Sequence, residues 1–243
     1  MDLTSTILFS VLTGLLPPVI WLAYFLREDR LHPEPSYRIL NTFIYGMLAV
    51  PFALAFQVFV NGLIPEANNI ALLFKNNYLT AIVVLILWAT VEEIVKYVAA
   101  YKGGISKKDN NEPIDPIIYL ITAALGFAAL ENTLFAFGPF LDGQTATALI
   151  TGNLRFIGAT LLHVASSAII GMFIAFSYYK KEAIKGKFLF YGLVLSIVLH
   201  TIFNSFIIRG ENFTLIGFSA VWISIVLIII LFEKVKRIYK PFN

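Results

Sequence analysis

The sequence predicts an all-α membrane protein: a bundle of about seven transmembrane helices forming one domain over residues 1–243. The first observation is composition, since 58% of the 243 residues are hydrophobic and the mean hydropathy is +0.80. The second is charge, because only 14% of the residues are charged, whereas soluble domains have about 25%. The third is that apolar stretches of about 20 residues, the length that spans a bilayer, recur along the chain.

Seven stretches are long and apolar enough to span the bilayer. They are Leu3–Leu26, Ile39–Leu63, Tyr78–Tyr101, Pro116–Phe137, Phe156–Tyr179, Phe188–Ile208 and Phe213–Phe232. The loops between them are too short to hold a soluble domain. The first ten residues contain no Lys or Arg, so they lack the basic start of a signal peptide and we expect the first stretch to be retained as a helix.

The distribution of basic residues predicts the orientation of the bundle. Fourteen of the 18 Lys and Arg residues lie in the first, third and fifth loops and in the C-terminal tail, whose last cation is Lys240. Three lie in the other loops, and Lys96 lies inside the third stretch. Because cytoplasmic loops are enriched in these residues, we expect the N-terminus outside and the C-terminus in the cytoplasm. This placement accounts for the basic residues, so no nucleic-acid partner is expected.

Ionisable side chains inside the apolar stretches are the strongest sign of function. The six are Glu92, Glu93, Lys96, Glu131, His163 and His200. A charge in hydrocarbon costs several kcal/mol, so such groups normally face a protein interior or a watered cavity and mark a functional site. Four different stretches contribute them, which predicts an active site. The chain has no cysteine, so disulfides, thiolate catalysis and cysteine metal ligands are excluded.

Glu92, Glu93 and Lys96 share a face of the third predicted helix, since residues three and four apart are neighbours on a helix. One lysine neutralises one carboxylate and leaves the other for a second partner or for general-base work. A buried ion pair that locks the bundle is the alternative. Glu131 has no cation within one helical turn, so it needs water, a metal or a polar group from another helix.

Structural roles are expected for two further polar residues, and a last pair allows two interpretations. Asn132 is expected to form an interhelical hydrogen bond, and Arg155 to anchor its helix at the outer interface. His200 and Asn204 lie four residues apart on one helix face. Together they can donate hydrogen bonds to a developing oxyanion, or His200 can bind a metal while Asn204 orients a neighbour.

Depth along the helices leaves one mismatch. At about 1.5 Å per residue, Glu131, His163 and His200 lie on the order of 10 Å below the outer surface. Glu92 lies about 20 Å below it by the same estimate. A tilted helix, shifted helix ends or a watered cavity could bring these residues to one level.

The motifs resemble those of the PrsW-type intramembrane proteases, within the superfamily that includes the type-2 CAAX prenyl proteases. The matching residues are Glu92-Glu93-Ile-Val-Lys96, Phe127-Ala-Ala-Leu-Glu131, His163, His200-Thr-Ile-Phe-Asn204, and in the first loop Asp29-Arg30 with Pro33-Glu34-Pro35. The CAAX branch has Arg at the position of Lys96 and His at that of Glu131, so this chain resembles the PrsW side. Without the resemblance, the first loop is interpreted as a solvated cytoplasmic loop.

The resemblance implies an intramembrane endopeptidase of the bacterial cytoplasmic membrane that hydrolyses a peptide bond in a membrane-anchored protein. Site-1 cleavage of an anti-sigma factor, a form of regulated proteolysis, is the activity associated with the family. A proton-coupled transporter that uses the same buried residues is the alternative function. Against it, no inverted repeat and no broken helix pair are evident in the sequence.

Two mechanisms remain open, and both use Glu92 as general base with Glu93 and Lys96 beside it. In the first, His163, His200 and Glu131 bind zinc. In the second no metal is present: Glu92 acts with Glu131 or His163, and His200 with Asn204 forms the oxyanion hole. The sequence lacks the His-Glu-x-x-His zinc motif, which favours the second mechanism.

Overall fold

A computed structural model describes residues 2–30 and 32–238; Lys240, counted above among the cations of the tail, lies outside them. Within these ranges seven helical segments are long and apolar enough to span a membrane, as predicted. The helices are α1 (Leu3–Phe25), α2 (Ser36–Leu63), α4 (Tyr78–Ala100), α5 (Asp115–Leu141), α6 (Thr145–Ile157), α7 (Ala159–Phe176), α8 (Glu182–Ile208) and α9 (Glu211–Val235). Shorter elements are η1 (Leu26–Asp29), η2 (Pro65–Asn69), α3 (Ile70–Asn76) and the π-helical turn η3 (Tyr101–Ile105) that extends α4.

The fifth span is broken, which the sequence analysis did not predict. Gly158 has φ −117° and ψ −81°, outside the helical region, and it separates α6 from α7. A break in a membrane helix leaves carbonyl groups without intrahelical partners. Two tryptophans supply donors here: Trp21 Nε1 donates to Phe156 O at 3.4 Å, and Trp222 Nε1 donates to Ile157 O at 3.1 Å.

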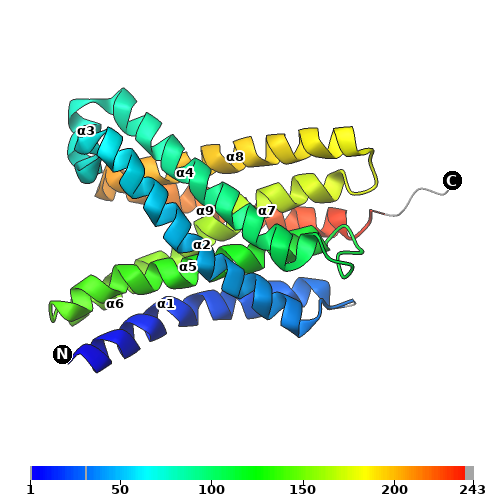
Figure 1. The fold of residues 1–243 in the computed structure, drawn as a ribbon, viewed down its shortest axis with the longest axis horizontal. Coiled ribbons are helices and arrows are strands. Elements are labelled where there is room, and N and C mark those ends of the chain that lie inside the picture. The colour runs from blue at the N-terminus through cyan, green and yellow to red at the C-terminus, as the bar shows by residue number, and fades with distance from the viewer. Residues whose placement is uncertain (1, 31, 239–243) are drawn as a thin grey trace.

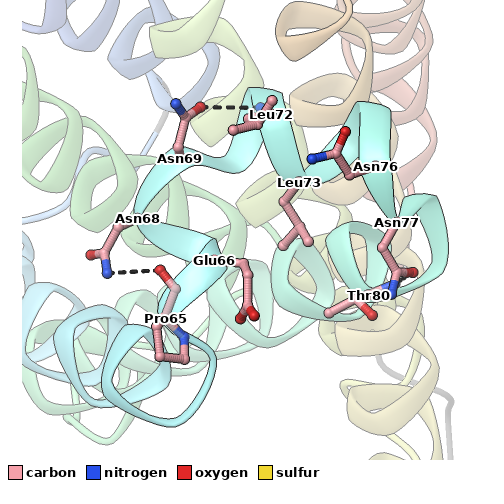
Figure 2. A pocket seen from close by; sticks show the side chains of 9 residues that line it. All are labelled: Pro65, Glu66, Asn68, Asn69, Leu72, Leu73, Asn76, Asn77 and Thr80. Carbon is pink, nitrogen blue, oxygen red and sulfur yellow. Dashed lines mark hydrogen bonds between the residues drawn. The ribbon is translucent and has the colours of Figure 1, made fainter.

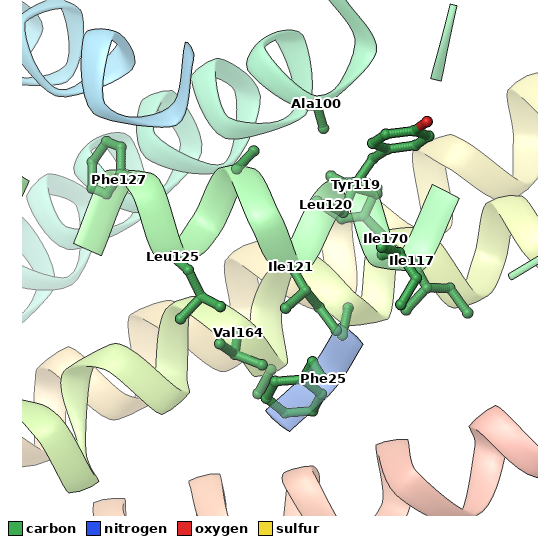
Figure 3. Close-up of a cluster of buried hydrophobic side chains, with 14 of the residues drawn as sticks. Phe25, Ala100, Ile117, Tyr119, Leu120, Ile121, Leu125, Phe127, Val164 and Ile170 are labelled. Atoms are coloured by element: carbon green, nitrogen blue, oxygen red, sulfur yellow. The ribbon is translucent and has the colours of Figure 1, made fainter. Parts of the chain in front are cut away.

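Helices α5 and α7 form the centre of the bundle, and the other spans surround them (Figure 1). Every residue of α5 from Asp115 to Ala129 is buried, so this part of the helix is packed around its whole circumference. Figure 3 shows its side chains, among them Leu120, Ile121 and Leu125, packed with Phe25 of α1 and Val164 of α7. This core holds α5 and α7 in the fixed relation that the polar residues on them require.

Small residues bring α2 and α5 into close contact. A Cβ on Gly126 would lie 2.0 Å from the carbonyl oxygen of Phe43, and one on Gly46 would lie 2.1 Å from that of Ala123. Only glycine allows the two backbones to approach this closely, as is common between membrane helices. The contact holds α2 beside α5, and Gln57 in the C-terminal half of α2 reaches the site described below.

The loops with most of the basic residues gather at one end of the bundle, the right-hand end in Figure 1, together with the end of α9. Hydrogen bonds and ion pairs join the first and third loops: Arg38 Nε lies 2.6 Å from Asp109 Oδ2, and His32 Nδ1 lies 2.8 Å from Glu112 Oε1. Tyr178, after α7, donates to Asn110 O at 2.9 Å. This is the end that the positive-inside rule predicts to face the cytoplasm.

The first loop is packed against the bundle, so its interpretation as a solvated segment was wrong for its acidic residues. Asp29 is buried, and its carboxylate accepts the Glu34 N–H at 3.2 Å. Glu34 in turn accepts a hydrogen bond from Tyr119 on α5. Burial raises the pKa of Asp29 to about 7, assisted by the nearby Asp115 carboxylate, and burial raises the pKa of Glu34 to about 8.

Candidate active site

Glu93 is the centre of a buried polar network. Its side chain is fully enclosed, and it accepts hydrogen bonds from Lys96 Nζ at 2.6 Å, Ser196 Oγ at 2.9 Å and His200 Nδ1 at 2.7 Å. The sequence left open which glutamate pairs with Lys96; in the structure it is Glu93. Three donors occupy most of the acceptor sites of a carboxylate, so Glu93 is suited to hold the neighbouring groups in place.

Glu92 lies beside this network with one oxygen free. Gln57 of α2 donates Nε2–H to Glu92 Oε1 at 3.0 Å. The other oxygen, Oε2, is buried and has no hydrogen-bond partner among the described residues, and His200 Nε2 lies 3.5 Å from it. A buried acceptor without a partner is costly, so this oxygen is the one that a proton, a water molecule or a metal would meet.

The partners of His200 determine its tautomer. The Glu93 carboxylate can only accept, so the proton of a neutral His200 ring sits on Nδ1 and the lone pair is on Nε2. That lone pair faces Glu92 Oε2. Two acceptors facing each other at 3.5 Å require a shared proton or a cation between them. A neutral His200 therefore cannot donate to an oxyanion through Nε2, which it would have to do in the metal-free mechanism.

His163 is held from both sides. Lys96 Nζ lies 3.2 Å from its Nδ1, and Glu131 Oε2 lies 2.9 Å from its Nε2. Because an ammonium group can only donate, a neutral ring accepts at Nδ1 and donates from Nε2–H to Glu131. The Phe127 ring covers the pair, with its centroid 5.3 Å from that of His163 and 5.5 Å from Lys96 Nζ.

Arg155 of α6 is the cation that Glu131 needs. Its guanidinium contacts Glu131 Oε2, donates from Nε to Asn132 Oδ1 at 2.5 Å and covers the Phe135 ring at 4.0 Å. Asn132 also donates to Thr160 Oγ1 at 3.0 Å, so its predicted interhelical role is confirmed. Arg155 points into the bundle, so its expected role as an interfacial anchor was wrong. The charge-assisted hydrogen bond to Glu131 accounts for this position.

Two residues of this network were not singled out from the sequence: Gln57 and Ser196. Ser196 precedes His200 by four residues on α8, so its position on the same face was a usable signal. Gln57 is a polar residue inside a predicted span, which was a weaker signal. Asn204 lies on the His200 face of α8 and is half-buried, and its side chain has no hydrogen-bond partner within residues 2–30 and 32–238.

The tilt of the helices accounts for the depth mismatch of Glu92. Helices α2 and α4 cross the bundle obliquely to α5 (Figure 1). Glu92 is 14 residues from the start of α4, yet it meets His200, which is eight residues from the end of α8. Because α4 is inclined to the other helices, a larger number of its residues is needed to reach the depth of His200 in the bundle.

The spacing and the type of the ligand atoms show whether the buried Glu and His side chains suit a metal ion. One ligand atom each from Glu92, His163 and His200 lie within 4.8 Å of one another, and all three side chains are buried. Two histidines and one carboxylate are a common ligand set of catalytic zinc. Glu93 holds the far nitrogen of His200, as a carboxylate typically does behind a metal-bound histidine. The set fits a metal once His163 gives up one of its two hydrogen bonds.

This group differs from the zinc set that the sequence suggested. Glu92 belongs to it in place of Glu131, whose carboxylate is taken up by Arg155 and His163. Among the described residues a second group of possible ligands exists: Asp29, Glu112 and Asp115, at the opposite end of the bundle. The metal-ligand roles of His163, His200 and Glu131 remain predictions.

A pocket of about 490 Å³ lies apart from this network, between η2 and α3 (Figure 2). Four of its nine lining residues are asparagines, and three of these form hydrogen bonds with nearby backbone groups. Asn69 accepts from the Leu72 N–H at 3.1 Å, and Asn77 accepts from the Thr80 N–H at 3.1 Å, so both cap helix N-termini. None of the predicted site residues lines this pocket.

Comparison with known proteins gives one consistent family. The model of a family described as "PrsW family intramembrane metalloprotease" matches residues 34–232. Protease PrsW of Geobacillus kaustophilus is 28% identical over 209 residues, which cover 84% of this chain and 83% of the relative. Protease PrsW of Clostridioides difficile is 28% identical over 196 residues, covering 79% and 76%. That of Bacillus subtilis is 24% identical over 194 residues, covering 79% and 80%. No solved structure matches the chain significantly.

Proposed function

Since the chain belongs to the PrsW family of intramembrane metalloproteases and is a multi-pass protease of the bacterial cell membrane, we propose that it cleaves a membrane-anchored protein at the extracytoplasmic side. The substrate class that the family resemblance implies is an anti-sigma factor, cut at the first of its cleavage sites. A proton-coupled transporter is not favoured, because the relatives named above are proteases.

One observation carries the catalytic assignment: Glu92 Oε2 is buried, has no partner among the described residues and lies 3.5 Å from the lone pair of His200. Gln57 holds the other carboxylate oxygen at 3.0 Å, so the free oxygen cannot turn away. A fixed, desolvated carboxylate is a good acceptor for the proton of a hydrolytic water. Glu92 is therefore our general base.

The other residues hold this base and its neighbours. Glu92 takes the proton as the water oxygen bonds to the carbonyl carbon, and the proton passes to the amide nitrogen as the C–N bond breaks. Glu93 keeps the His200 lone pair directed at Glu92. Lys96 neutralises Glu93 and fixes His163. In our assignment Glu93, Lys96 and His200, together with Glu131, His163 and Asn204, complete the catalytic set.

A metal in this site would be held by Glu92, His163 and His200, which are buried and close enough to share one ion. Glu92 would then be a ligand, so its assignment as the general base applies to the site without a metal. When bound, zinc supplies Lewis-acid polarisation of the carbonyl and lowers the pKa of its bound water. Glu131 and Arg155 then orient His163, and Glu93 orients His200, as carboxylates behind ligating histidines do.

The test is cleavage in proteoliposomes that contain the purified protein and a single-span anti-sigma factor from the same organism. We expect wild type to cut on the extracytoplasmic side of the span. Glu92→Gln, which keeps the shape and removes the basic oxygen, should leave no detectable product. Glu182→Gln, at the exposed carboxylate on α8, is the matched control and should cleave like wild type.

An active Glu92→Gln variant would refute the assignment of the base, and wild type that cuts no membrane-anchored substrate would refute the function. Elemental analysis of the same preparations tests the metal independently of activity. Near-stoichiometric zinc in wild type, lost in His200→Ala, is expected if the ligand set is correct. Zinc that is retained in His200→Ala would contradict it.

A further inference from the structure

The chain has three tryptophans, and one of them differs from the other two in its hydrogen bonding. Trp21 and Trp222 donate their indole N–H to the carbonyls at the α6–α7 break. Trp88 Nε1 is also enclosed, but in the part of the chain that the structure describes it has no acceptor. An enclosed donor without an acceptor costs about 1–3 kcal/mol, so it needs a reason to be kept.

The position of Trp88 suggests that reason. It precedes Glu92 by four residues on α4, so the two side chains share a face of that helix. Trp88 and Phe56 both pack against the smaller hydrophobic cluster of Val60, Val84 and Leu85. Phe56 is next to Gln57 on α2, and Gln57 holds Glu92. Trp88 therefore packs against this cluster and lies one helical turn before the base on α4.

Two unsatisfied atoms on this face are complementary in character. Trp88 Nε1 is a donor and Glu92 Oε2 is an acceptor, and Glu92 is 5% exposed. Hydrolysis needs such a pair beside the scissile bond: an acceptor for the proton of water and a donor for the carbonyl oxygen, where negative charge develops. His200 does not supply this donor in its neutral form, because Glu93 takes the Nδ1 proton and leaves Nε2 without one.

We propose that Trp88 donates its indole N–H to the scissile carbonyl oxygen of the substrate. Trp88 is then a catalytic residue that stabilises the developing oxyanion, beside Glu92 as the base. The proposal rests on the proposed protease function. A donor in a dry, membrane-embedded site stabilises charge more strongly than it does in water, which makes one N–H effective here.

The experiment replaces each tryptophan by phenylalanine, which keeps an aromatic ring and removes the N–H. The reporter is an anti-sigma factor that wild type cleaves and Glu92→Gln does not, so failure of the proposed function appears as no cleavage by wild type. With this reporter, Trp88→Phe should lower kcat by about 10- to 100-fold and leave KM within about threefold. Trp21→Phe and Trp222→Phe, which lose structural hydrogen bonds only, should keep kcat within about threefold.

A second readout does not depend on turnover. In Glu92→Gln labelled with ¹⁵N, the indole resonance of Trp88, assigned by its loss in the Trp88→Phe double variant, should move downfield when the reporter is added. The resonances of Trp21 and Trp222 should stay in place. A Trp88→Phe enzyme with wild-type kcat, a loss that is confined to KM, or a Trp88 resonance that does not move would each overturn the proposal.

Discussion

Replacing Lys96 by methionine tests whether the buried network is ionic. Lys96 and Glu93 are both fully enclosed, and the Lys96 Nζ to Glu93 Oε1 distance is 2.6 Å. Removing one partner of a buried pair leaves an uncompensated charge and destabilises by about 3–5 kcal/mol. Glu93 would keep Ser196 Oγ and His200 Nδ1 as donors, but neither is an ammonium group. We therefore expect the full effect of the lost ammonium group.

The matched control is Lys185→Met. Lys185 pairs with Glu182 at the same i, i+3 spacing and at 2.8 Å, but Glu182 is 87% exposed. Exposed pairs contribute about 0–1 kcal/mol, so the two variants separate burial from geometry. For a chain of this size, about 1 kcal/mol corresponds to roughly 2–4 °C in the unfolding midpoint. Lys96→Met should therefore unfold about 6–20 °C below wild type, and Lys185→Met within about 4 °C of it.

Thermal unfolding in detergent micelles, followed by circular dichroism, measures both midpoints. The double variant Glu93→Gln/Lys96→Met should recover part of the loss, because no buried charge then remains unpaired. If Lys96→Met unfolds no earlier than Lys185→Met, the pair is not ionic in the folded protein. If the double variant is less stable than Lys96→Met, the ionic explanation of the network is also wrong.

Two further predictions concern packing and pH. Gly126→Ala should destabilise the bundle by about 2 kcal/mol or more, because its Cβ would overlap the Phe43 carbonyl, whereas Gly186→Ala has open space and should stabilise α8 slightly. Equal unfolding midpoints for the two variants would contradict the close contact of α2 and α5. Burial raises the pKa of Asp29 from 3.8 to about 7 and that of Glu34 from 4.5 to about 8. The folded protein then binds more protons than the unfolded chain between these values, so this contribution to stability is fully present below pH 4 and is lost as the pH rises towards 8. Hydrogen exchange of residues 26–38 should therefore quicken between pH 5 and pH 8 beyond its intrinsic increase, and Asp29→Asn/Glu34→Gln should remove the excess; an excess that persists in the double variant would show that other groups cause it.

Much of the fold could be predicted from the sequence because a bilayer imposes a length and a composition on each span. The seven spans were therefore visible as apolar stretches, and the structure confirms their number within the described residues. The break at Gly158 was not visible, because most of α6 is polar enough to have been assigned to the loop before the predicted stretch Phe156–Tyr179, and a single glycine near the start of a span has several meanings. Its stabilisation depends on Trp21 and Trp222, which come from the first and last spans.

The candidate site was predictable as a set of residues and not as a network. Ionisable groups in hydrocarbon are rare, so Glu92, Glu131 and His200 stood out in the sequence itself. Which glutamate meets Lys96 depends on the rotation of α4 against α8, and both glutamates are within reach along the helix. Arg155 was assigned to the interface because its distance in sequence from Glu131 conceals their contact.

The sequence by itself determined that the chain is a seven-span membrane protein with a polar site inside it, because hydrophobic length and buried charge are properties of local sequence. The tertiary structure decided which residues of that site form hydrogen bonds with one another: Glu93 holds His200, Arg155 holds Glu131, and Gln57 binds one oxygen of Glu92 and leaves the other free. These pairings join residues 24 to 107 positions apart. They follow from helix tilt, helix rotation and the close approach of α2 to α5, which arise only when the helices pack together.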